Sequence, residues 1–330
     1  MPKQIEWRGF VDLQVNGYLG IDFSDPALSP DAARKTCRAL LAHGTAAFLP
    51  TIVTSAHDTY RRNLPLLASL LQEQEFAGRL LGLHLEGPFI SPEPGARGVH
   101  NPAHIRPPDP IELDELIELS SATVKLITIA AEIPGADEFI RHAVSRGIAV
   151  SLGHQLANPS ALAKAAESGA TALTHLGNGI PAMIPRHENP LWAGMSEDQL
   201  NGMIITDGHH LPPPVIKCIL RAKGIERSIV VSDAAPIAGM PPGPYHALGN
   251  DVILEASGRL YNPESGYLAG SGSTMFECMN HLAGLDILSE DELLRVGFLN
   301  PLKLIGLTPS AISDSAPHIR YDPKLKTFFL

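Results

Sequence analysis

The sequence predicts an α/β protein whose eight parallel strands close into a (β/α)8 barrel of the TIM type. Short apolar stretches alternate with segments of helical pattern, which is typical of βαβ units built on a parallel sheet. Eight such stretches precede residue 234, and that number favours a closed barrel over an open sheet. The stretch from Leu80 to Leu85 is apolar on both faces of the expected strand, as in a parallel strand buried on both sides.

The individual elements follow from the apolar runs and from the residues that start or stop them. We expect strands at residues 9–15, 45–49, 80–86, 124–130, 148–152, 170–174, 201–206 and 228–232. We expect helices between them at residues 29–43, 57–75, 111–119, 135–145, 159–167 and 212–221. Ser29-Pro30-Asp31 is a good helix start because a serine side chain can cap the first free N–H groups. Pro50 is expected to end the second strand.

Beyond residue 233 the alternation of strands and helices stops. Residues 252–254 and 259–261 predict a hairpin, and residues 275–282 and 290–298 predict two closing helices. We therefore assign residues 1–310 to the barrel domain and residues 311–330 to a C-terminal extension of unassigned structure. Two long loops are expected at residues 87–110 and 177–200, and the first is too long to be an idle connection.

Composition narrows the classes of partner. The chain of 330 residues carries a net charge of -10 and contains no run rich in lysine or arginine, which argues against nucleic acid and anionic membrane surfaces as partners. No apolar run approaches the thickness of a bilayer, and the N-terminus does not resemble a signal peptide. Cys37, Cys218 and Cys278 are widely spaced and odd in number, so we expect reduced thiols and a cytoplasmic protein.

Four polar side chains stand directly after expected strands, namely Glu86, His154, His175 and Asp233. In a barrel all strands end at the same face, so these side chains are expected to converge on one mouth. A lone histidine in such a place is usually a hydrogen-bonded structural residue, but four coincidences of type and position favour a site. Two imidazoles and a carboxylate can hold a divalent metal ion, and a further aspartate can act as general base.

The same residues belong to motifs that follow one another in a fixed order: Gly9 to Gly17, Leu49-Pro50-Thr51, His84-Leu85-Glu86-Gly87-Pro88, His100-Asn101-Pro102, Gly153-His154, Thr174-His175-Leu176, Thr206-Asp207-Gly208-His209-His210 and Val231-Ser232-Asp233-Ala234. Together they resemble the N-acetylglucosamine-6-phosphate deacetylase family of the amidohydrolase superfamily. The resemblance extends from about residue 9 to about residue 306 and implies a barrel of the metal-dependent hydrolase kind.

The resemblance also implies roles for individual residues. Glu86, His154 and His175 match ligands of one divalent metal ion, with zinc expected and iron, cobalt or manganese as alternatives. Asp233 matches the catalytic acid/base, and His100, which follows Val99 in the first long loop, matches the residue that contacts the acetamide. The remaining matches are to residues that contact the substrate. Asn178 and Gly179 match contacts with the phosphate, and Asp207 to His210 and Leu268-Ala269-Gly270 match contacts with the sugar. Arg186 matches an arginine that binds the phosphate of the substrate held by a partner subunit in a homodimer.

Three departures from the family pattern modify this expectation. Gln14-Val15-Asn16 replaces the His-x-His that holds a second metal in many amidohydrolases, so we expect one metal ion. The loop after His175 reads Gly177-Asn178-Gly179, where two glycines give the chain more freedom. The small accessory β-domain of the family is expected to be absent or vestigial. His209 and His210 are adjacent, so only His210, which holds the family position, is expected to face the site.

The function implied is metal-dependent hydrolysis of the acetamide of N-acetylglucosamine 6-phosphate. Deacetylation of the galactosamine epimer, or of a related N-acyl sugar, is an alternative that the sequence leaves open. An alternative of another class is a non-catalytic regulator that binds a sugar phosphate. A site without Asp233 or one of the metal ligands would favour that alternative, and none of these residues is missing.

Overall fold

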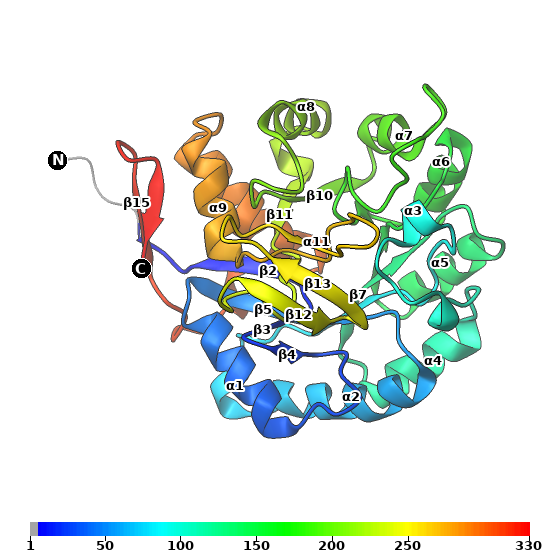
Figure 1. Ribbon diagram of the computed structural model, residues 1–330, viewed down its shortest axis with the longest axis horizontal. Coiled ribbons are helices and arrows are strands. Elements are labelled where there is room, and N and C mark those ends of the chain that lie inside the picture. Colours follow the sequence, from blue (N-terminus) through cyan, green and yellow to red (C-terminus); the bar gives the residue numbers. More distant parts are fainter. Residues whose placement is uncertain (1–5) are drawn as a thin grey trace.

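The computed structural model describes residues 6–330, in which a parallel sheet of eight strands forms a nearly closed barrel surrounded by helices (Figure 1). Neighbouring strands follow the order β11-β10-β9-β8-β7-β6-β5-β2. The two outer strands meet through a parallel bridge between Val15 and Ala234. The Asp12 carboxylate joins them as well, because it accepts hydrogen bonds from the Ser232 N–H (3.1 Å) and hydroxyl (2.5 Å). The barrel expected from the sequence is therefore confirmed. Its strands are β2 (Phe10–Val15), β5 (Thr45–Val53), β6 (Leu83–Glu86), β7 (Val124–Ile129), β8 (Ala149–Leu152), β9 (Ala172–Leu173), β10 (Asn201–Ile205) and β11 (Ser228–Val231).

Helices cover the outside of the barrel, and several begin with the same two-residue signal. A serine, aspartate or asparagine followed by proline starts four of them, at Ser29, Asp109, Asn158 and Asn189. Each of these side chains accepts a hydrogen bond from a backbone N–H of the first turn, and proline fits the first helical position because its missing N–H would have no partner there. The helices are α1 (Pro30–Leu41), α2 (His57–Leu71), α3 (Pro94–Arg97), α4 (Pro110–Leu119), α5 (Ala136–Ser145), α6 (Pro159–Glu167), α7 (Pro190–Ser196), α8 (Pro213–Lys223), α9 (Met275–Gly284), α10 (Glu290–Leu294) and α11 (Asn300–Leu304). Within residues 6–330, no helix is long and apolar enough to cross a membrane.

The structure corrects several expected boundaries. Strand β5 does not end at Pro50 but continues to Val53. Pro50 pairs with Val15 of β2 next to a shift in register, and from Thr51 onward the strand also pairs with β6. The missing N–H of the proline therefore falls at an irregular point of the ladder, where it is tolerated. The loop at residues 177–200 contains α7, and the single helix expected at 290–298 is instead α10, a π turn (Arg295–Leu299) and α11.

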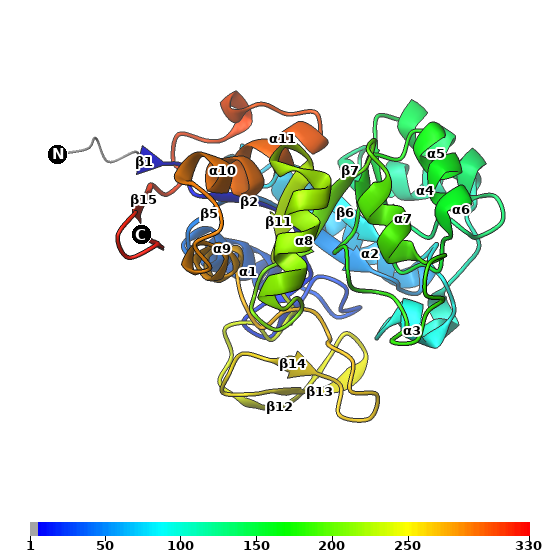
Figure 2. The same ribbon diagram turned by 90° about the horizontal axis from the view of Figure 1, so that it is seen from above.

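Two small sheets stand beside the barrel. β12 (Gly243–Ala247), β13 (Asn250–Leu254) and β14 (Leu260–Tyr261) form an antiparallel sheet that includes the expected hairpin. This sheet lies across one end of the barrel in Figure 1 and projects from it in Figure 2. The segment that had no assigned structure contributes β15 (Ile319–Asp322) and β16 (Thr327–Phe329), which form a second sheet with β1 (Glu6–Trp7). A two-strand ribbon, β3 (Gly17–Tyr18) with β4 (Ile21–Asp22), follows β2.

The inside of the barrel changes from apolar to polar towards the mouth. One apolar cluster fills the interior and is closed at the far end by Phe298, Leu302 and Ile305 of the C-terminal helices. Above it, hydrogen bonds connect side chains from neighbouring strands: His84 with Thr128 (2.9 Å), Thr128 with Thr174 (2.8 Å), and Thr174 with Ser151 (2.6 Å). Buried polar groups need such partners. The layer lies directly beneath the strand ends and fixes their relative positions.

Candidate active site

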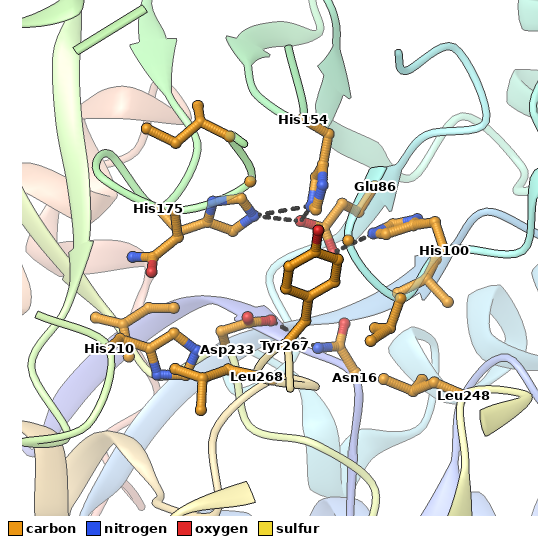
Figure 3. Close-up of a pocket in the computed structure, with 18 of the residues that line it drawn as sticks. Asn16, Glu86, His100, His154, His175, His210, Asp233, Leu248, Tyr267 and Leu268 are labelled. Atoms are coloured by element: carbon orange, nitrogen blue, oxygen red, sulfur yellow. Dashed lines mark hydrogen bonds and ion pairs between the residues drawn. The ribbon is translucent and has the colours of Figure 1, made fainter. Parts of the chain in front are cut away.

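The strand ends bring Glu86, His154 and His175 together at the mouth of the barrel (Figure 3). Glu86 is the last residue of β6, while the two histidines follow β8 and β9. The Nε2 atoms of His154 and His175 lie 3.0 Å apart, and they lie 3.3 Å and 3.1 Å, respectively, from Oε1 of Glu86. All three side chains are buried, so the convergence of one carboxylate and two imidazoles excludes a solvated surface cluster.

These three residues fit a divalent metal ion. Their donor atoms all lie within 4.8 Å of one another. Nδ1 of His154 lies 2.8 Å from the carbonyl oxygen of Ala96, which assigns the proton to Nδ1 and leaves Nε2 free as a donor to a metal. Burial alone would raise the pKa of Glu86, but the hydrogen bonds and charges of His154 and His175 lower it well below its usual value. The carboxylate is therefore ionised, as a metal ligand must be.

Asp233 lies beside this cluster and is held by two side-chain amides. Its Oδ1 accepts hydrogen bonds from Asn16 Nδ2 (2.7 Å) and from Gln14 Nε2 (3.0 Å). The same Gln14 nitrogen donates to Oε1 of Glu86 at 2.7 Å, so one amide bridges the two carboxylates. Burial, and then the charge of Glu86, raise the pKa of Asp233 to about 6. A carboxyl group whose pKa lies near neutrality can both accept and return a proton.

His100 approaches the cluster from the long loop after β6. Its Nε2 lies 3.9 Å from Oε2 of Glu86, and its Nδ1 lies 2.8 Å from the hydroxyl of Thr54. Burial, followed by the charge of His154, lowers the pKa of His100 to about 3. The imidazole is therefore neutral, and it can take part in hydrogen bonds without adding a positive charge.

Three residues of the site have an unusual backbone conformation. The φ angles of His154, His175 and Asp233 are 51°, 32° and 50°, in the left-handed region that residues other than glycine rarely adopt. Each follows the end of a strand, where the reversed turn directs the side chain into the mouth. Backbone strain of this kind is concentrated at functional sites, where the surrounding structure maintains it.

The cavity above the cluster has a volume of about 200 Å³. Most residues predicted to form the site line it: Glu86, Val99, His100, His154, His175, Asn178, Gly179, His210, Asp233, Leu268 and Gly270. Gly179 approaches the cluster closely, because a Cβ atom there would lie 2.9 Å from Cε1 of His175. The sequence motifs thus identify side chains that do meet in space.

Asp207 and Ala269, expected to contact the sugar, do not line the cavity, and neither does Arg186, for which the expectation was contact with a partner subunit's substrate. Asp207 lies behind His210 and accepts a hydrogen bond from its Nδ1 at 2.8 Å, so it orients the imidazole that lines the cavity. Burial alone would raise the pKa of Asp207, but the hydrogen bond from His210 lowers it. Ala269 is buried in the core of the β12–β14 sheet, and Arg186 is exposed outside the cavity lining. His209 turns away, with Nε2 3.0 Å from the carbonyl oxygen of Ser257.

Sequence reasoning missed several residues of the cavity. Leu248 lies in the turn between β12 and β13, Tyr267 follows β14, and Asn16 lines the floor beside Asp233. Asn16 was predicted to bear only on the number of metal ions, although its position directly after β2 was a signal for the floor, because His154, His175 and Asp233 also follow strands. Leu248 and Tyr267 had no such signal, since the path of an inserted sheet across the barrel depends on tertiary packing.

Comparisons with known proteins identify relatives of the whole barrel. No protein-family model matches the chain. The N-acetylglucosamine-6-phosphate deacetylase of Homo sapiens is 35% identical over 314 residues, which cover 92% of this chain and 75% of the relative. The N-acetylgalactosamine-6-phosphate deacetylase of Escherichia coli O157:H7 is 31% identical over 299 residues, which cover 90% and 77%.

Solved structures agree with these relatives. A mutant N-acetyl-D-glucosamine-6-phosphate deacetylase from Mycobacterium smegmatis, in complex with N-acetyl-D-glucosamine-6-phosphate, superposes with a TM-score of 0.87 at 28% identity. The alignment covers 98% of this chain and 84% of that one. The N-acetylglucosamine-6-phosphate deacetylase of Thermotoga maritima superposes with a TM-score of 0.84 at 25% identity, covering 99% and 86%.

Proposed function

The chain belongs to the N-acetylglucosamine-6-phosphate deacetylase family, and from this premise we propose that it hydrolyses the acetamide of N-acetylglucosamine 6-phosphate. The products are glucosamine 6-phosphate and acetate. The observation that supports the proposal most directly is the arrangement of Asp233 next to the cluster of Glu86, His154 and His175, inside one cavity.

We assign the metal ion to Glu86, His154 and His175. Two imidazoles and a carboxylate suit zinc, with iron, cobalt and manganese as alternatives. When bound, a divalent ion polarises the carbonyl group and lowers the pKa of water. The amide hydrogens of Gln14 and Asn16 are directed at the oxygens of Glu86 and Asp233, so the space beside β2 holds donors that repel a second cation. We therefore propose one metal ion per chain.

Asp233 acts as the carrier of the proton. It takes a proton from water as the water oxygen forms a bond to the acetyl carbon. It then donates this proton to the amide nitrogen as the carbon–nitrogen bond breaks. The proton is needed because a neutral amine is a good leaving group, whereas the anion that would leave without it is a very poor one. Gln14 and Asn16 occupy Oδ1 of Asp233, which leaves Oδ2 for this exchange.

His100 is proposed to hold the carbonyl oxygen of the acetamide. It is neutral, buried and next to the cluster, so an N–H of its imidazole can donate to the oxygen as negative charge develops. Its contact with the hydroxyl of Thr54 restrains the ring at the opposite nitrogen. His210 and the segment Asn178-Gly179 line the same cavity and are proposed to contact the sugar and its phosphate.

Arg186 is proposed to bind the phosphate group of the substrate that is held in the active site of a partner subunit, within a homodimer. A guanidinium suits phosphate because its planar fork donates two parallel hydrogen bonds. The Arg186 loop (residues 180–189) exposes apolar side chains, with Met183 90% exposed, and Trp192 just beyond the loop is 55% exposed. An apolar groove continues from Trp192 to Val215 of α8. Exposed apolar surface of this extent favours an interface over a solvated loop.

Deacetylation of N-acetylgalactosamine 6-phosphate is a second candidate. The relative from Escherichia coli O157:H7 that bears this name is 31% identical to the chain. The two substrates differ in the configuration of one hydroxyl group, and both require the same floor of metal ligands and Asp233. We also propose a cytoplasmic location, in keeping with the free thiols of Cys37, Cys218 and Cys278.

The proposal is tested by measuring acetate release from N-acetylglucosamine 6-phosphate, its galactosamine epimer and unphosphorylated N-acetylglucosamine, together with the metal content of the purified protein. We expect turnover of a phosphorylated substrate and about one divalent ion per chain. No acetate from any of the three substrates by metal-loaded protein would exclude the proposed reaction. Two bound ions in the fully active protein would contradict the assignment of Gln14 and Asn16.

A further inference from the structure

The turns and connections of the β12–β14 sheet place three side chains over the cavity, namely Leu248, Tyr267 and Leu268. We call the sheet together with these connections (residues 243–271) the roof. The sheet shares a small apolar cluster with the barrel, in which Val252, Leu254 and Leu260 pack with Ala235 and Ile237 of the segment after β11. The sheet is therefore packed directly against the end of the barrel, and this contact helps to order its side chains. The roof is largely apolar where it faces the cavity, whereas the floor beneath it consists of ionised and hydrogen-bonding groups, so a bound molecule meets chemically different surfaces above and below.

The roof is fixed to the barrel at two points. Ser271 donates its N–H to the carbonyl oxygen of Asp233 and accepts from the N–H of Ala235, both at 2.8 Å. On the other side, the amide nitrogen of Asn250 donates to the carbonyl oxygen of Val99 (2.9 Å) and to that of Leu248 (2.7 Å). Val99 precedes His100, so Asn250 joins the roof to the loop that carries a residue of the site. Both ends of the roof are thus fixed relative to the floor.

The turn that carries Tyr267 is also well held. The side-chain oxygen of Asn262 accepts from the N–H groups of Glu264 (3.0 Å) and Ser265 (2.8 Å). The N–H of Asn262 in turn donates to the carbonyl oxygen of Tyr267 at 2.9 Å. The backbone of Tyr267 is therefore restrained at its carbonyl, whereas its side chain remains 37% exposed.

The side chain of Tyr267 makes no hydrogen bond within the described part of the chain. Its hydroxyl has no hydrogen-bond partner among residues 6–330. Figure 3 shows its ring across the mouth of the cavity, in front of Glu86. A restrained aromatic ring with a free hydroxyl at the rim of a polar cavity presents both an apolar face and a hydrogen-bonding group to a ligand.

We propose that Tyr267 is a substrate-binding residue that covers the sugar, with its ring against the C–H face of the pyranose and its hydroxyl bonded to a polar group of the sugar. The inference rests on the proposed function, since it takes the substrate to be an N-acetylated hexosamine phosphate. A pyranose has apolar C–H surfaces between its hydroxyl groups, and an aromatic ring packs well against them. Tyr267 thereby holds the sugar down on the floor and takes no part in the movement of protons.

The proposal is tested with Tyr267→Leu and Tyr267→Phe, compared with Tyr261→Phe as a matched control. Tyr261 belongs to the same sheet, but it lies outside the cavity lining and its ring is covered by the guanidinium of Arg259 at 4.3 Å. For each variant, KM and kcat are measured by acetate release, and metal content and thermal unfolding are compared with wild type. Binding without turnover is measured by calorimetry with the same substrate in an Asp233→Asn background.

Loss of the ring in Tyr267→Leu is expected to raise KM about tenfold, and loss of the hydroxyl in Tyr267→Phe about threefold. Because the contact exists both before and during reaction, kcat should change by less than about twofold. Metal content should remain at the wild-type level, as should the KM of Tyr261→Phe. Unchanged KM and unchanged affinity in Tyr267→Leu would overturn the role of Tyr267 while leaving the proposed reaction intact. Absence of turnover in the wild-type protein would instead overturn the reaction itself.

Discussion

The floor of the cavity and the Arg186 loop differ in how their side chains are held. On the floor, Glu86, His175 and Asp233 are at most 8% exposed, and each has polar partners from another strand. In the loop, Asn189 pins the backbone by donating to the carbonyl oxygens of Pro185 (2.7 Å) and Arg186 (3.3 Å), while the Arg186 side chain is free in solvent. The floor is complete within one chain. The loop is ordered in its backbone but presents its functional group outward.

The proposed roles assign the chemistry to the floor and the recognition of the phosphate to the Arg186 loop. Changes on the floor should alter kcat, because they touch the bond that breaks. Changes in the Arg186 loop should alter KM, because they touch the phosphate remote from that bond. The predictions below test this division, beginning with the largest effect.

Replacing Asp233 with asparagine should reduce kcat by about 100-fold or more, because asparagine cannot accept and return a proton. Metal content and substrate affinity should be retained, since the metal is assigned to Glu86, His154 and His175. His175→Ala serves as the contrasting variant and should lose metal as well as turnover. Wild-type turnover in Asp233→Asn would show that another group carries the proton.

Replacing Arg186 with alanine should raise KM for the phosphorylated sugar by about 10- to 100-fold, the range expected for hydrogen bonds to a charged group. Hydrolysis of the unphosphorylated sugar should be almost unaffected. Arg62, which is exposed on α2, provides a matched control, and Arg62→Ala should behave as wild type.

Mixing the Arg186→Ala and Asp233→Asn proteins should restore part of the activity if Arg186 serves the partner subunit. Some mixed dimers would then contain one site with an intact Asp233 and an intact Arg186. Sedimentation at the assay concentration should show a dimer. A fully active monomer, or no recovery between subunits shown to exchange, would contradict the shared site.

The pKa of Asp233 gives a prediction for stability in the metal-free protein. Burial and the charge of Glu86 raise this pKa from 3.8 to about 6, so the folded chain binds more protons than the unfolded chain between these values. Its contribution to stability is therefore present at low pH and is lost as pH rises through about 6. Relative to Asp233→Asn, the free energy of unfolding of metal-stripped wild type should fall by on the order of 2 kcal/mol between pH 4 and pH 6. Denaturant titrations at several pH values measure this free energy of unfolding. If it depends on pH in the same way in both proteins, the raised pKa of Asp233 is refuted.

The smallest effect is expected for Trp192→Phe. The indole Nε1 of Trp192 donates to the carbonyl oxygen of Arg186 at 2.9 Å, and phenylalanine keeps the apolar ring but removes this donor. One neutral hydrogen bond contributes about 1 kcal/mol, so KM for the phosphorylated sugar should rise about threefold to fivefold. The kcat value should be unchanged, and so should the association of subunits. An unchanged KM would show that the bond does not position Arg186.

The division between floor and loop also marks what the sequence could predict. Glu86, His154, His175 and Asp233 were found because parallel strands of a barrel must end at one face, which is a rule of topology that sequence reveals directly. The amide bridge from Gln14 to both carboxylates was not found, because its existence depends on side-chain rotamers across the barrel. Helix α7 was missed although Asn189-Pro190 carried the same signal as Ser29-Pro30.

Other features depend on contacts between distant parts of the chain. The pairing of β1 with β15 joins Trp7 to Ile319, and neither segment has a pattern that names its partner. The roof is a similar case, since Asn250 reaches Val99 across 151 positions of sequence. Arg186 lies in neither category: the family resemblance implies a phosphate contact, and a single chain presents the side chain to solvent.

The left-handed backbone at His154, His175 and Asp233 has a consequence for how this chain can change over evolutionary time. A residue other than glycine in this region carries about 1 kcal/mol of strain, so the barrel holds roughly 3 kcal/mol that serves its activity and not its stability. Drift in a gene copy released from its task would favour glycine or asparagine at these positions, since both relieve the strain. In a related barrel that no longer catalyses hydrolysis, substitutions should therefore appear first at these three positions, before the core or the helices change.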